Sequence, residues 1–345
     1  MKLPVLLLWA FLHITIQNPI NYWTLKHNVL VLEVTGEHKG HYPLTCLTED
    51  AASSLAVLCR EDKDSGIIWK KNGNNLAHGN IHCVALQESS GEGNYSCHDK
   101  DGSLLNHTQV LILEANKKRI LQTDSFKCST PNYNGTFHCS WSWHPIRVGK
   151  VALIKVWRPS NSSDLHCTED SSGHWSCRTS RSDFSCSVDL SGHGFSCTDH
   201  QHCPFAEEAH FIHITLYVVY DFHIENYSKN FYLSEIVKPD KVHIRKVKDN
   251  TVEWIYPSTW DNPYSYFPLT FQLAQLKDKT ACGDIKTRKI LTVNCTNDCS
   301  CKIKRRTKTV CFRAKDALSN SEWSEWSSEI IKPKKKRNRR RISLI

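Results

Sequence analysis

Two kinds of feature are missing from this 345-residue chain, and each absence narrows its function. Beyond residue 16, no apolar run approaches the ~20 residues that a membrane-spanning helix needs. The chain also lacks a nucleophile elbow, a phosphate-binding glycine loop and a pair of carboxylates placed for acid–base catalysis. We therefore expect no membrane anchor, no enzyme with catalytic residues, and no cofactor. No internal repeat shorter than a domain is present, and the only low-complexity segment is a basic tail.

The first residues have the composition of a secretion signal. An apolar run from Leu3 to Ile16 is too short to span a bilayer and is placed like the hydrophobic region of a signal peptide. We expect cleavage near Asn18–Asn21, so residues 1–21 form the signal peptide and the product is secreted. In an extracellular, oxidising environment the 16 cysteines are expected to form disulfides.

Six Asn-x-Ser/Thr sequons agree with export. Four are expected to carry N-linked glycans: Asn106, Asn134, Asn161 and Asn226. The sequons at Asn94 and Asn294 adjoin or contain a cysteine in an expected strand, so they are weaker candidates.

The positive charge is concentrated at one end. The formal net charge is +9, and Lys332–Arg341 carries eight of these charges, which leaves about +1 for the rest of the chain. We expect residues 332–345 to be a disordered tail. Two hypotheses follow: the tail binds sulfated glycosaminoglycans by counterion release, or it is trimmed at the convertase-like sequence Arg337-Asn338-Arg339-Arg340.

Residues 22–115 have the pattern of an immunoglobulin-like sandwich, with a Trp between two Cys and a Tyr two positions before the second Cys. The residues are Cys59, Trp69, Tyr95 and Cys97. The spacing to the Trp predicts two disulfides, Cys59–Cys97 and Cys46–Cys83. Because residues 43–46 also have a strand-like composition, Cys46–Cys97 remains an alternative.

Residues 116–237 form a second expected domain. Cys128 and Cys139 lie eleven positions apart on strands joined by an Asn-Gly turn, so they are predicted to clamp a hairpin. Cys177 and Cys186 lie in a Ser/Gly/His-rich stretch and are expected to close a local loop. Long strands are expected at 211–220 and 231–236. The histidines of the stretch lack helical i, i+4 spacing, so they are expected to be solvated rather than metal ligands: His174, His193, His200 and His202.

Residues 238–331 form a third expected domain with an odd number of cysteines: Cys282, Cys295, Cys299, Cys301 and Cys311. At least one of the five must be free or bonded to another chain. A zinc site is the rival interpretation, but disulfides are favoured in a secreted chain. The spacing does not determine the pairing.

Two tryptophans near the end lie among glutamates and small hydroxyl residues: Trp323, Ser324, Trp326 and Ser327. We expect the indoles to lie outside a β-sandwich and stack with cations of a neighbouring strand, Arg313 and Lys315. The segment resembles the WSxWS box of class I cytokine receptors. Likewise, Cys139-Ser140-Trp141 resembles the first half of a cytokine-receptor homology module, which implies a second bridge, Cys167–Cys197.

The combination resembles the interleukin-12 beta subunit family, the receptor-like subunits shared by interleukin-12 and interleukin-23 within the type 3 class I cytokine receptors. The resemblance covers nearly the whole chain, and its specific segments are 22–26, 132–135, 203–208, 225–228, 236–240 and 264–267. It implies an all-β chain, with an immunoglobulin-like domain followed by two fibronectin type III domains.

The resemblance also implies partners. A four-helix-bundle alpha subunit would bind at the elbow between domains two and three, and the immunoglobulin-like domain would face a cell-surface class I cytokine receptor chain in immune signalling. Cys203 matches the cysteine that bonds the alpha subunit, and it is the odd cysteine of domain two. The positions that match the pocket for a partner arginine are Tyr133, Glu207, Tyr266 and Asp316, a set suited to a guanidinium. Two departures are the missing terminal cysteine and Leu318, which replaces a tyrosine.

Other functions share this fold. A soluble receptor or decoy would bind a helical cytokine reversibly, whereas Cys203 favours a permanent, disulfide-linked subunit. An adhesive matrix protein would need no helical partner, and the elbow residues argue against it. The sequence does not distinguish a heterodimer from a homodimer.

Overall fold

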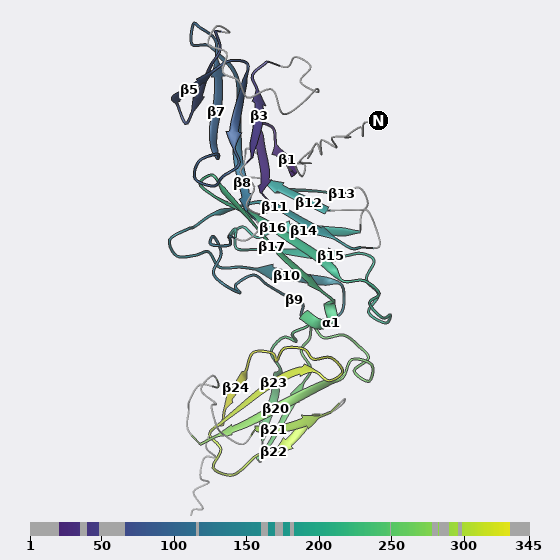
Figure 1. The fold of residues 1–345 in the computed structure, drawn as a ribbon. Helices are drawn as coiled ribbons and strands as arrows, with labels where there is room; N and C mark the ends of the chain where they lie inside the picture. The colour runs from purple at the N-terminus through teal and green to yellow at the C-terminus, as the bar shows by residue number, and fades with distance from the viewer. Residues whose placement is uncertain are drawn as a thin grey trace, which may run out of the picture. The chain divides into compact units, whose positions relative to one another are not determined.

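A computed structural model describes residues 21–34, 40–47, 66–114, 117–159, 165–169, 175–179, 183–248, 250–277, 282, 290–295 and 299–331. This part is built from strands and one short helix (Figure 1). Contacts divide the chain into two compact units, residues 1–118 with 219–225 and residues 119–218 with 226–345. No helix in the described ranges is long and apolar enough to cross a membrane. The predicted features that lie outside those ranges are the signal run 3–16, Cys59, Asn161, His174 and the tail 332–345.

The first unit is an immunoglobulin-like sandwich. Its strands are β1 Asn21–Lys26, β2 Val29–Val34, β3 His41–Thr45, β4 Ile68–Lys71, β5 Asn74–His78, β6 Ile81–Ala85, β7 Gly93–His98 and β8 Leu104–Glu114. One sheet has the order β1-β2-β8-β7-β4-β5, and β3 pairs with β6 in a second. Alternate residues of these strands point inward, so Leu32, Trp69 and Val110 share one buried core.

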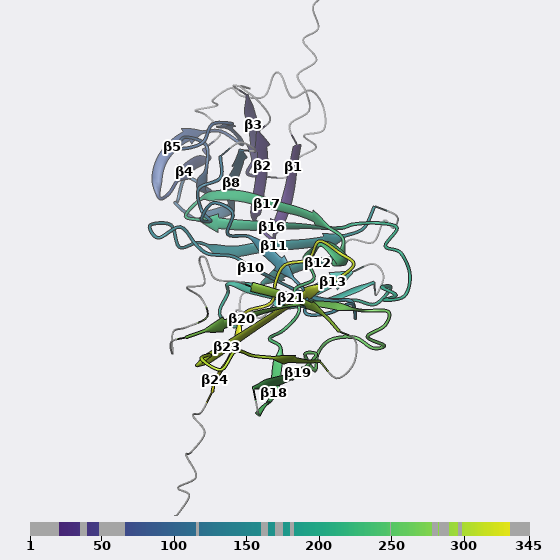
Figure 2. The ribbon, with the colours of Figure 1, turned by 90° about the horizontal axis from the view of Figure 1, so that it is seen from below.

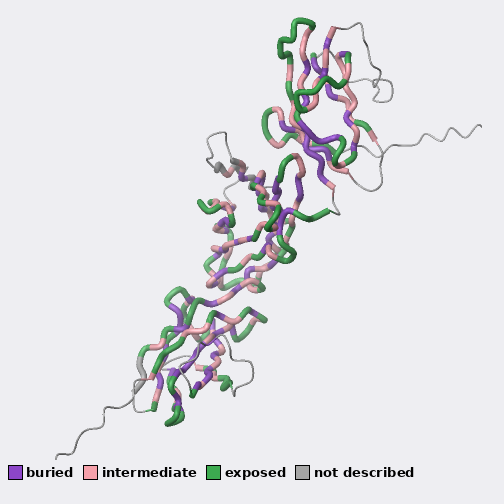
Figure 3. The backbone as a smooth tube through the Cα atoms, turned by 90° about the vertical axis from the view of Figure 1, so that its left-hand side faces the viewer, coloured by how far each residue is buried: buried purple, intermediate pink, exposed green. Residues whose placement is uncertain are grey.

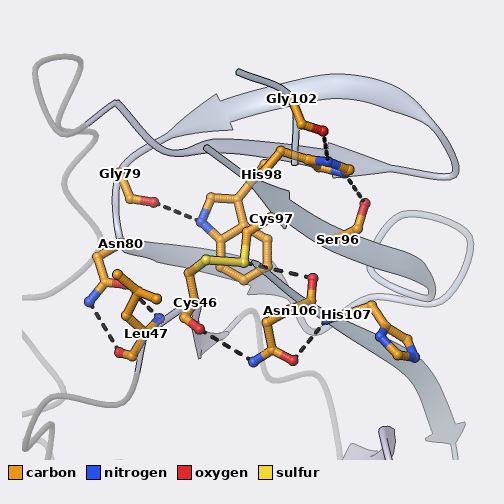
Figure 4. The surroundings of a disulfide bond; sticks show 11 residues. Cys46, Leu47, Gly79, Asn80, Ser96, Cys97, His98, Gly102, Asn106 and His107 are labelled. Atoms are coloured by element: carbon orange, nitrogen blue, oxygen red, sulfur yellow. Dashed lines mark hydrogen bonds between the residues drawn. A yellow bond between two sulfur atoms is a disulfide. The ribbon is translucent and has the colours of Figure 1, made fainter. Parts of the chain in front are cut away.

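The disulfide of this core joins Cys46 to Cys97, with their Cα atoms 5.9 Å apart (Figure 4). The predicted Cys59–Cys97 and Cys46–Cys83 bonds are therefore wrong, although Cys83 is disulfide-bonded. Cys46 directly follows β3, whose residue Leu44 packs in the core beside Trp69. The Cys-to-Trp spacing misled the prediction because 22 residues, rather than about ten, separate Cys46 from Trp69.

Two further hydrogen bonds mark the immunoglobulin-like pattern. The Trp69 indole donates to the Gly79 carbonyl at 2.8 Å. The Tyr95 hydroxyl donates to the Gly91 carbonyl at 2.7 Å, which is the tyrosine corner expected from the sequence. Burial raises the pKa of Tyr95 to about 12, with a smaller contribution from the Glu92 carboxylate.

The second unit holds two separate cores, shown as buried stretches in Figure 3. Around the first lie β9 Lys127–Ser129, β10 Thr136–Ser140, β11 Lys150–Trp157, β12 Leu165–Glu169, β13 Trp175–Thr179, β14 Phe184–Val188, β15 Gly194–Asp199, β16 Ile212–Tyr220 and β17 His223–Phe231. One layer has the order β13-β12-β11-β16-β17, and the other β14-β15-β10-β9. Phe137, Phe195 and Ile214 fill the space between the layers.

Cysteines of this domain bond to the residues directly opposite on neighbouring strands. The bonds are Cys128–Cys139 between β9 and β10, Cys167–Cys177 between β12 and β13, and Cys186–Cys197 between β14 and β15. The predicted Cys167–Cys197 and Cys177–Cys186 bonds are wrong. Each of these predicted bonds would join a strand of one sheet to a strand of the other. The register of each hairpin instead places Cys167 opposite Cys177, and Cys186 opposite Cys197.

The segment expected as a strand over 231–236 has a different structure. β17 ends at Phe231, and Leu233–Ile236 forms the helical turn α1. The reason is a carboxylate from another segment: Glu208 accepts hydrogen bonds from the Leu233 and Ser234 amides at 2.6 and 2.9 Å. These first-turn amides have no partner inside a helix, so an acidic side chain stabilises the turn.

The second core of this unit belongs to the third domain. Its strands are β18 His243–Lys248, β19 Thr251–Ile255, β20 Leu269–Leu276, β21 Ile290–Asn294, β22 Ser300–Lys302, β23 Thr309–Asp316 and β24 Ser327–Ile330. They form the sheets β18-β19-β22 and β21-β20-β23-β24. Figure 2 labels all of these strands except β22, which is labelled in Figure 1. Disulfides join Cys282 to Cys311 and Cys295 to Cys299. Among the cysteines in the described ranges, Cys203 and Cys301 are free.

Candidate partner-binding site

A cavity of about 660 Å³ lies where loops of the second domain meet loops of the third. The four residues carried over from the family resemblance, Tyr133, Glu207, Tyr266 and Asp316, all line it. Further lining residues come from three segments: His202, Pro204, Ala206 and Glu208; Tyr232 and Ser234; and Ser265, Phe267 and Leu318. The fold therefore brings together Tyr133 and Asp316, which lie 183 positions apart in the sequence.

Tyr133, in the second domain, contacts the third domain at this cavity through its amide, its hydroxyl and its ring. Its amide donates to the Asp261 carboxylate at 2.6 Å, and its hydroxyl donates to the Asp316 carboxylate at 3.0 Å. Its ring stacks on Phe267, with centroids 5.5 Å apart. Burial, and next the negative charge of Asp316, raise the pKa of the Tyr133 phenol far above its ordinary value. The phenol therefore stays protonated and remains a hydrogen-bond donor.

Asp316 is the buried carboxylate of the cavity lining. It is 2% exposed, and its Oδ1 accepts hydrogen bonds from the Leu318 and Ser319 amides at 2.6 and 2.8 Å. With the Tyr133 hydroxyl on Oδ2, the carboxylate already has three donors. A carboxylate has room for about four, so Asp316 can accept one further donor from a ligand.

Glu207 is the carboxylate that is open to a ligand. It is exposed, and it has no hydrogen bond or ion pair with any residue in the described ranges. Its neighbour Glu208 is committed to the first turn of α1. On the cavity wall, the Nε2 atom of His202 is buried and has no hydrogen-bond partner among the described residues. The cavity therefore offers a cationic side chain two carboxylates, Glu207, which is exposed, and Asp316, which is buried.

Aromatic and apolar side chains form the rim. Phe205 is 58% exposed and its ring lies 5.2 Å from Tyr266 and 5.5 Å from Phe267, measured between centroids. Tyr266 is 47% exposed and Leu318 is 78% exposed. Exposed apolar side chains around a cavity that also holds a few polar groups are typical of protein–protein contact sites. Sequence reasoning missed Phe205, because a single exposed aromatic residue carries no signal in the sequence.

Cys203 lies beside this cavity. Its thiol is free and exposed, and the next residue, Pro204, lines the cavity. The six other cysteines of the second domain are bonded to one another. A free exposed thiol beside a protein-binding cavity can form a disulfide with a bound chain.

The tryptophan box forms a stacked ladder on β23. The guanidinium carbon of Arg313 lies 4.7 Å from the Trp323 ring centroid and 4.6 Å from that of Trp326, and Lys315 Nζ lies 5.5 Å from Trp323. Ser324 fixes the segment through hydrogen bonds with the Ala314 backbone at 2.7 and 2.9 Å. Ser327 begins β24 and pairs with Phe312. These residues belong to the wall of the third domain rather than to the cavity.

The predicted glycan acceptors differ in exposure. Asn134 is exposed and adjoins Tyr133, so a glycan there would lie beside the cavity. Asn226 is half-buried, and the Asn106 side-chain amide donates to the Cys46 carbonyl at 3.4 Å (Figure 4).

The described ranges contain no group of three or more His, Cys, Asp or Glu side chains suited to a metal ion. Cys295, Cys299 and Cys311 form disulfides, so the rival zinc interpretation of this cysteine cluster is wrong.

A basic turn lies at the base of the tail. Five exposed cations occur within seven residues: Lys302, Lys304, Arg305, Arg306 and Lys308. None has an ion pair in the described part of the chain. The Ile331 amide donates to the Lys308 carbonyl at 2.9 Å, so the chain leaves the third domain beside this turn.

Comparison with known proteins agrees with the fold. Residues 123–220 match the family model for the cytokine interleukin-12p40 C-terminus. The chain is 28% identical over 327 residues to interleukin-12 subunit beta of Homo sapiens, covering 89% of this chain and 92% of that protein. It is 29% identical over 329 residues to the subunit of Macaca mulatta, with the same coverage, and 26% identical over 339 residues to that of Sigmodon hispidus, covering 93% and 96%. These relatives are cytokine subunits and not enzymes.

Proposed function

We propose, on the premise that the chain belongs to the interleukin-12 beta subunit family, that it is the secreted receptor-like subunit of a heterodimeric cytokine. In this proposal a four-helix-bundle alpha subunit binds at the elbow cavity between the second and third domains. The immunoglobulin-like domain contacts a cell-surface class I cytokine receptor chain. The observation that carries the proposal is the cavity itself, where an open carboxylate, Glu207, lies near a free thiol, Cys203.

The cavity fits an arginine of the partner. Glu207 and Asp316 offer carboxylate oxygens for the guanidinium fork, and Tyr133 and Tyr266 offer aromatic faces for stacking. Docking brings a partner cysteine to Cys203. Forming the bond removes two protons and two electrons from the two thiols, and a disulfide oxidant of the secretory pathway is reduced to a dithiol.

Co-expression with candidate four-helix subunits tests the proposal. We expect a disulfide-linked heterodimer on a non-reducing gel, which disappears in Cys203→Ser, while Cys301→Ser, the other free thiol, leaves it intact. A heterodimer that forms only reversibly, in the wild type as in Cys203→Ser, would support a soluble receptor or decoy instead. A linked product of twice the mass of the chain would identify a homodimer.

A second candidate function is attachment to sulfated glycosaminoglycans. It is favoured by the basic turn 302–308, which lies at the base of the basic tail. We expect heparin elution to require less salt after deletion of residues 332–345, and less again when Lys304, Arg305 and Arg306 are also changed to serine. Elution at the same salt concentration for all three proteins would reject this function.

A further inference from the structure

The segment that carries Cys203 has no regular secondary structure, yet it is fixed at several points. It runs from Asp199 at the end of β15 to Glu208, before β16 begins at Ile212. An irregular surface segment of this length is ordinarily among the more mobile parts of a domain. Here the side chains at its two ends, and one residue in its middle, are bonded to other elements.

The first anchor is a buried ion pair. Asp199 is 3% exposed, and both of its carboxylate oxygens face the Arg158 guanidinium; Arg158 Nη1 lies 3.2 Å from Oδ1, and Nη2 contacts Oδ2. The same Oδ1 accepts the Gln201 amide at 3.0 Å. The Arg158 guanidinium also lies 5.6 Å from the ring centroid of Phe184. A two-point carboxylate–guanidinium contact fixes orientation as well as distance, so the direction in which the segment leaves β15 is set.

The second anchor is Glu208, whose carboxylate accepts the Leu233 and Ser234 amides. This bond fixes the far end of the segment to α1. Between the anchors, the Tyr266 hydroxyl donates to the Phe205 carbonyl at 3.2 Å, and the Ala206 amide donates to the Cys203 carbonyl at 3.1 Å. Cys203 therefore begins a tight turn that is fixed on both sides, and its thiol is left exposed.

We propose that Arg158, Asp199 and Glu208 are positioning residues that hold the Cys203 thiol beside the cavity and away from the disulfides of its own domain. The identity of the chain that bonds this thiol rests on the proposed function, but the positioning does not. The competing reaction is internal. The Cys203 thiolate could attack one sulfur of Cys186–Cys197, only six residues before it, forming a new disulfide and releasing the other cysteine as a thiolate.

The test uses the full chain carrying Cys301→Ser, so that Cys203 is the one free thiol of the described ranges. Glu208→Ala removes the anchor on α1. Glu235→Ala is the matched control, because Glu235 lies in the same helix and accepts only the Tyr232 amide at 3.0 Å. Each protein is incubated at pH 8, and its disulfides are mapped by peptide mass spectrometry. The disulfide-linked fraction is measured after co-expression with the four-helix subunit.

For Glu208→Ala we expect Cys203 to be found bonded to Cys186 or Cys197. We expect the linked fraction to fall about fivefold, the change in an equilibrium that loss of a helix-capping side chain typically produces. Glu235→Ala should keep a free Cys203 and the wild-type linked fraction. Glu208→Gln retains one acceptor oxygen and should restore most of both properties, and it replaces the alanine variant if that variant is not secreted.

An unchanged disulfide map and an unchanged linked fraction in Glu208→Ala would overturn the proposal. So would equal changes in Glu208→Ala and Glu235→Ala, because these would indicate general loss of stability. If the wild type links to no helical subunit, the proposed function fails. The disulfide map of the chain alone then still decides whether Glu208 protects Cys203 from internal exchange.

Discussion

At the scale of single residues, the cavity depends on a few hydrogen bonds between partly buried polar groups. Tyr133 and Asp316 are the central pair, because the hydrogen bond between them joins the two domains; Asp316 is buried and Tyr133 is half-buried. When a buried donor or acceptor loses its partner, the free energy of unfolding falls by more than the hydrogen bond had contributed. The residues that shape the site are therefore also residues on which stability depends.

Tyr133→Phe should show this cost. The change removes the hydroxyl that Asp316 accepts and leaves one buried carboxylate oxygen without that donor. We expect the free energy of unfolding to fall by about 1–3 kcal/mol. Chemical denaturation measures it, with Tyr266→Phe as control, since that exposed hydroxyl donates to a carbonyl at 3.2 Å. A larger loss for Tyr266→Phe would contradict this account.

The raised pKa of Tyr95 predicts that the folded protein loses stability at alkaline pH. This pKa is raised from 10.0 to about 12 in the folded chain. As the pH rises, the unfolded chain therefore releases the phenol proton before the folded chain does. The contribution of Tyr95 to the free energy of unfolding is fully present below pH 10 and is lost between pH 10 and 12. At pH 11 the free energy of unfolding should be about 1 kcal/mol lower than at pH 9 from this group. Tyr95→Phe, compared with the wild type by urea denaturation at both pH values, should lose less between them.

At the scale of elements, the tryptophan ladder shows how a strand pattern becomes a stabilising surface. Alternation along β23 directs Phe312 and Ala314 into the core and Arg313 and Lys315 outward. The hydrogen bonds of Ser324 to Ala314 then bring both indoles over Arg313. One guanidinium thus contacts the rings of both tryptophans.

Arg313→Gln should therefore destabilise the third domain by about 1–2 kcal/mol, since two cation–π contacts are lost at a partly exposed site. Lys315→Gln is the matched control with a single, longer contact, and should cost about 0.5–1 kcal/mol. Thermal unfolding followed by tryptophan fluorescence measures both. Equal effects of the two substitutions would contradict the ladder as the stabilising feature.

Local patterns predicted elements well, and contacts between elements poorly. The Tyr95 corner and the strand carrying Arg313 follow from spacing and alternation within a few residues. The disulfides of the second domain do not, because they depend on which strands are neighbours. The turn α1 was expected as a strand because Glu208, which caps it, lies 25 residues earlier. The elbow residues were found only through the family resemblance, since no local rule relates Tyr133 to Asp316.

At the scale of the whole molecule, the second and third domains are joined by a few polar contacts. The Asn132 side chain donates to the Thr259 carbonyl at 2.7 Å, and the Tyr133 amide donates to Asp261 at 2.6 Å. The Tyr133 hydroxyl donates to the Asp316 carboxylate at 3.0 Å, and the Tyr266 hydroxyl donates to the Phe205 carbonyl at 3.2 Å. The rings of Tyr133 and Phe205 also pack on Phe267, so these contacts beside the cavity join the two domains.

Asp261→Ala should loosen the elbow without unfolding either domain. We expect faster hydrogen exchange at the Tyr133 amide and partner binding weaker by about 1 kcal/mol, because one partly buried hydrogen bond is lost. Asp240→Ala is the control, since its carboxylate accepts only the exposed Thr259 hydroxyl at 2.8 Å. Unchanged exchange in Asp261→Ala would show that this bond does not hold the elbow.

The pairing of neighbouring cysteines in the second domain has a consequence for biosynthesis. Its three disulfides close loops of 10 or 11 residues in strict order along the chain. If the chain is exported as proposed, each pair is complete 10 or 11 residues after its first cysteine enters the oxidising lumen, and no bond needs residues that are still to be made. When Cys203 emerges, every earlier cysteine of the domain already has a partner. On the proposed function, the order of synthesis then leaves the Cys203 thiol for the second chain of the heterodimer.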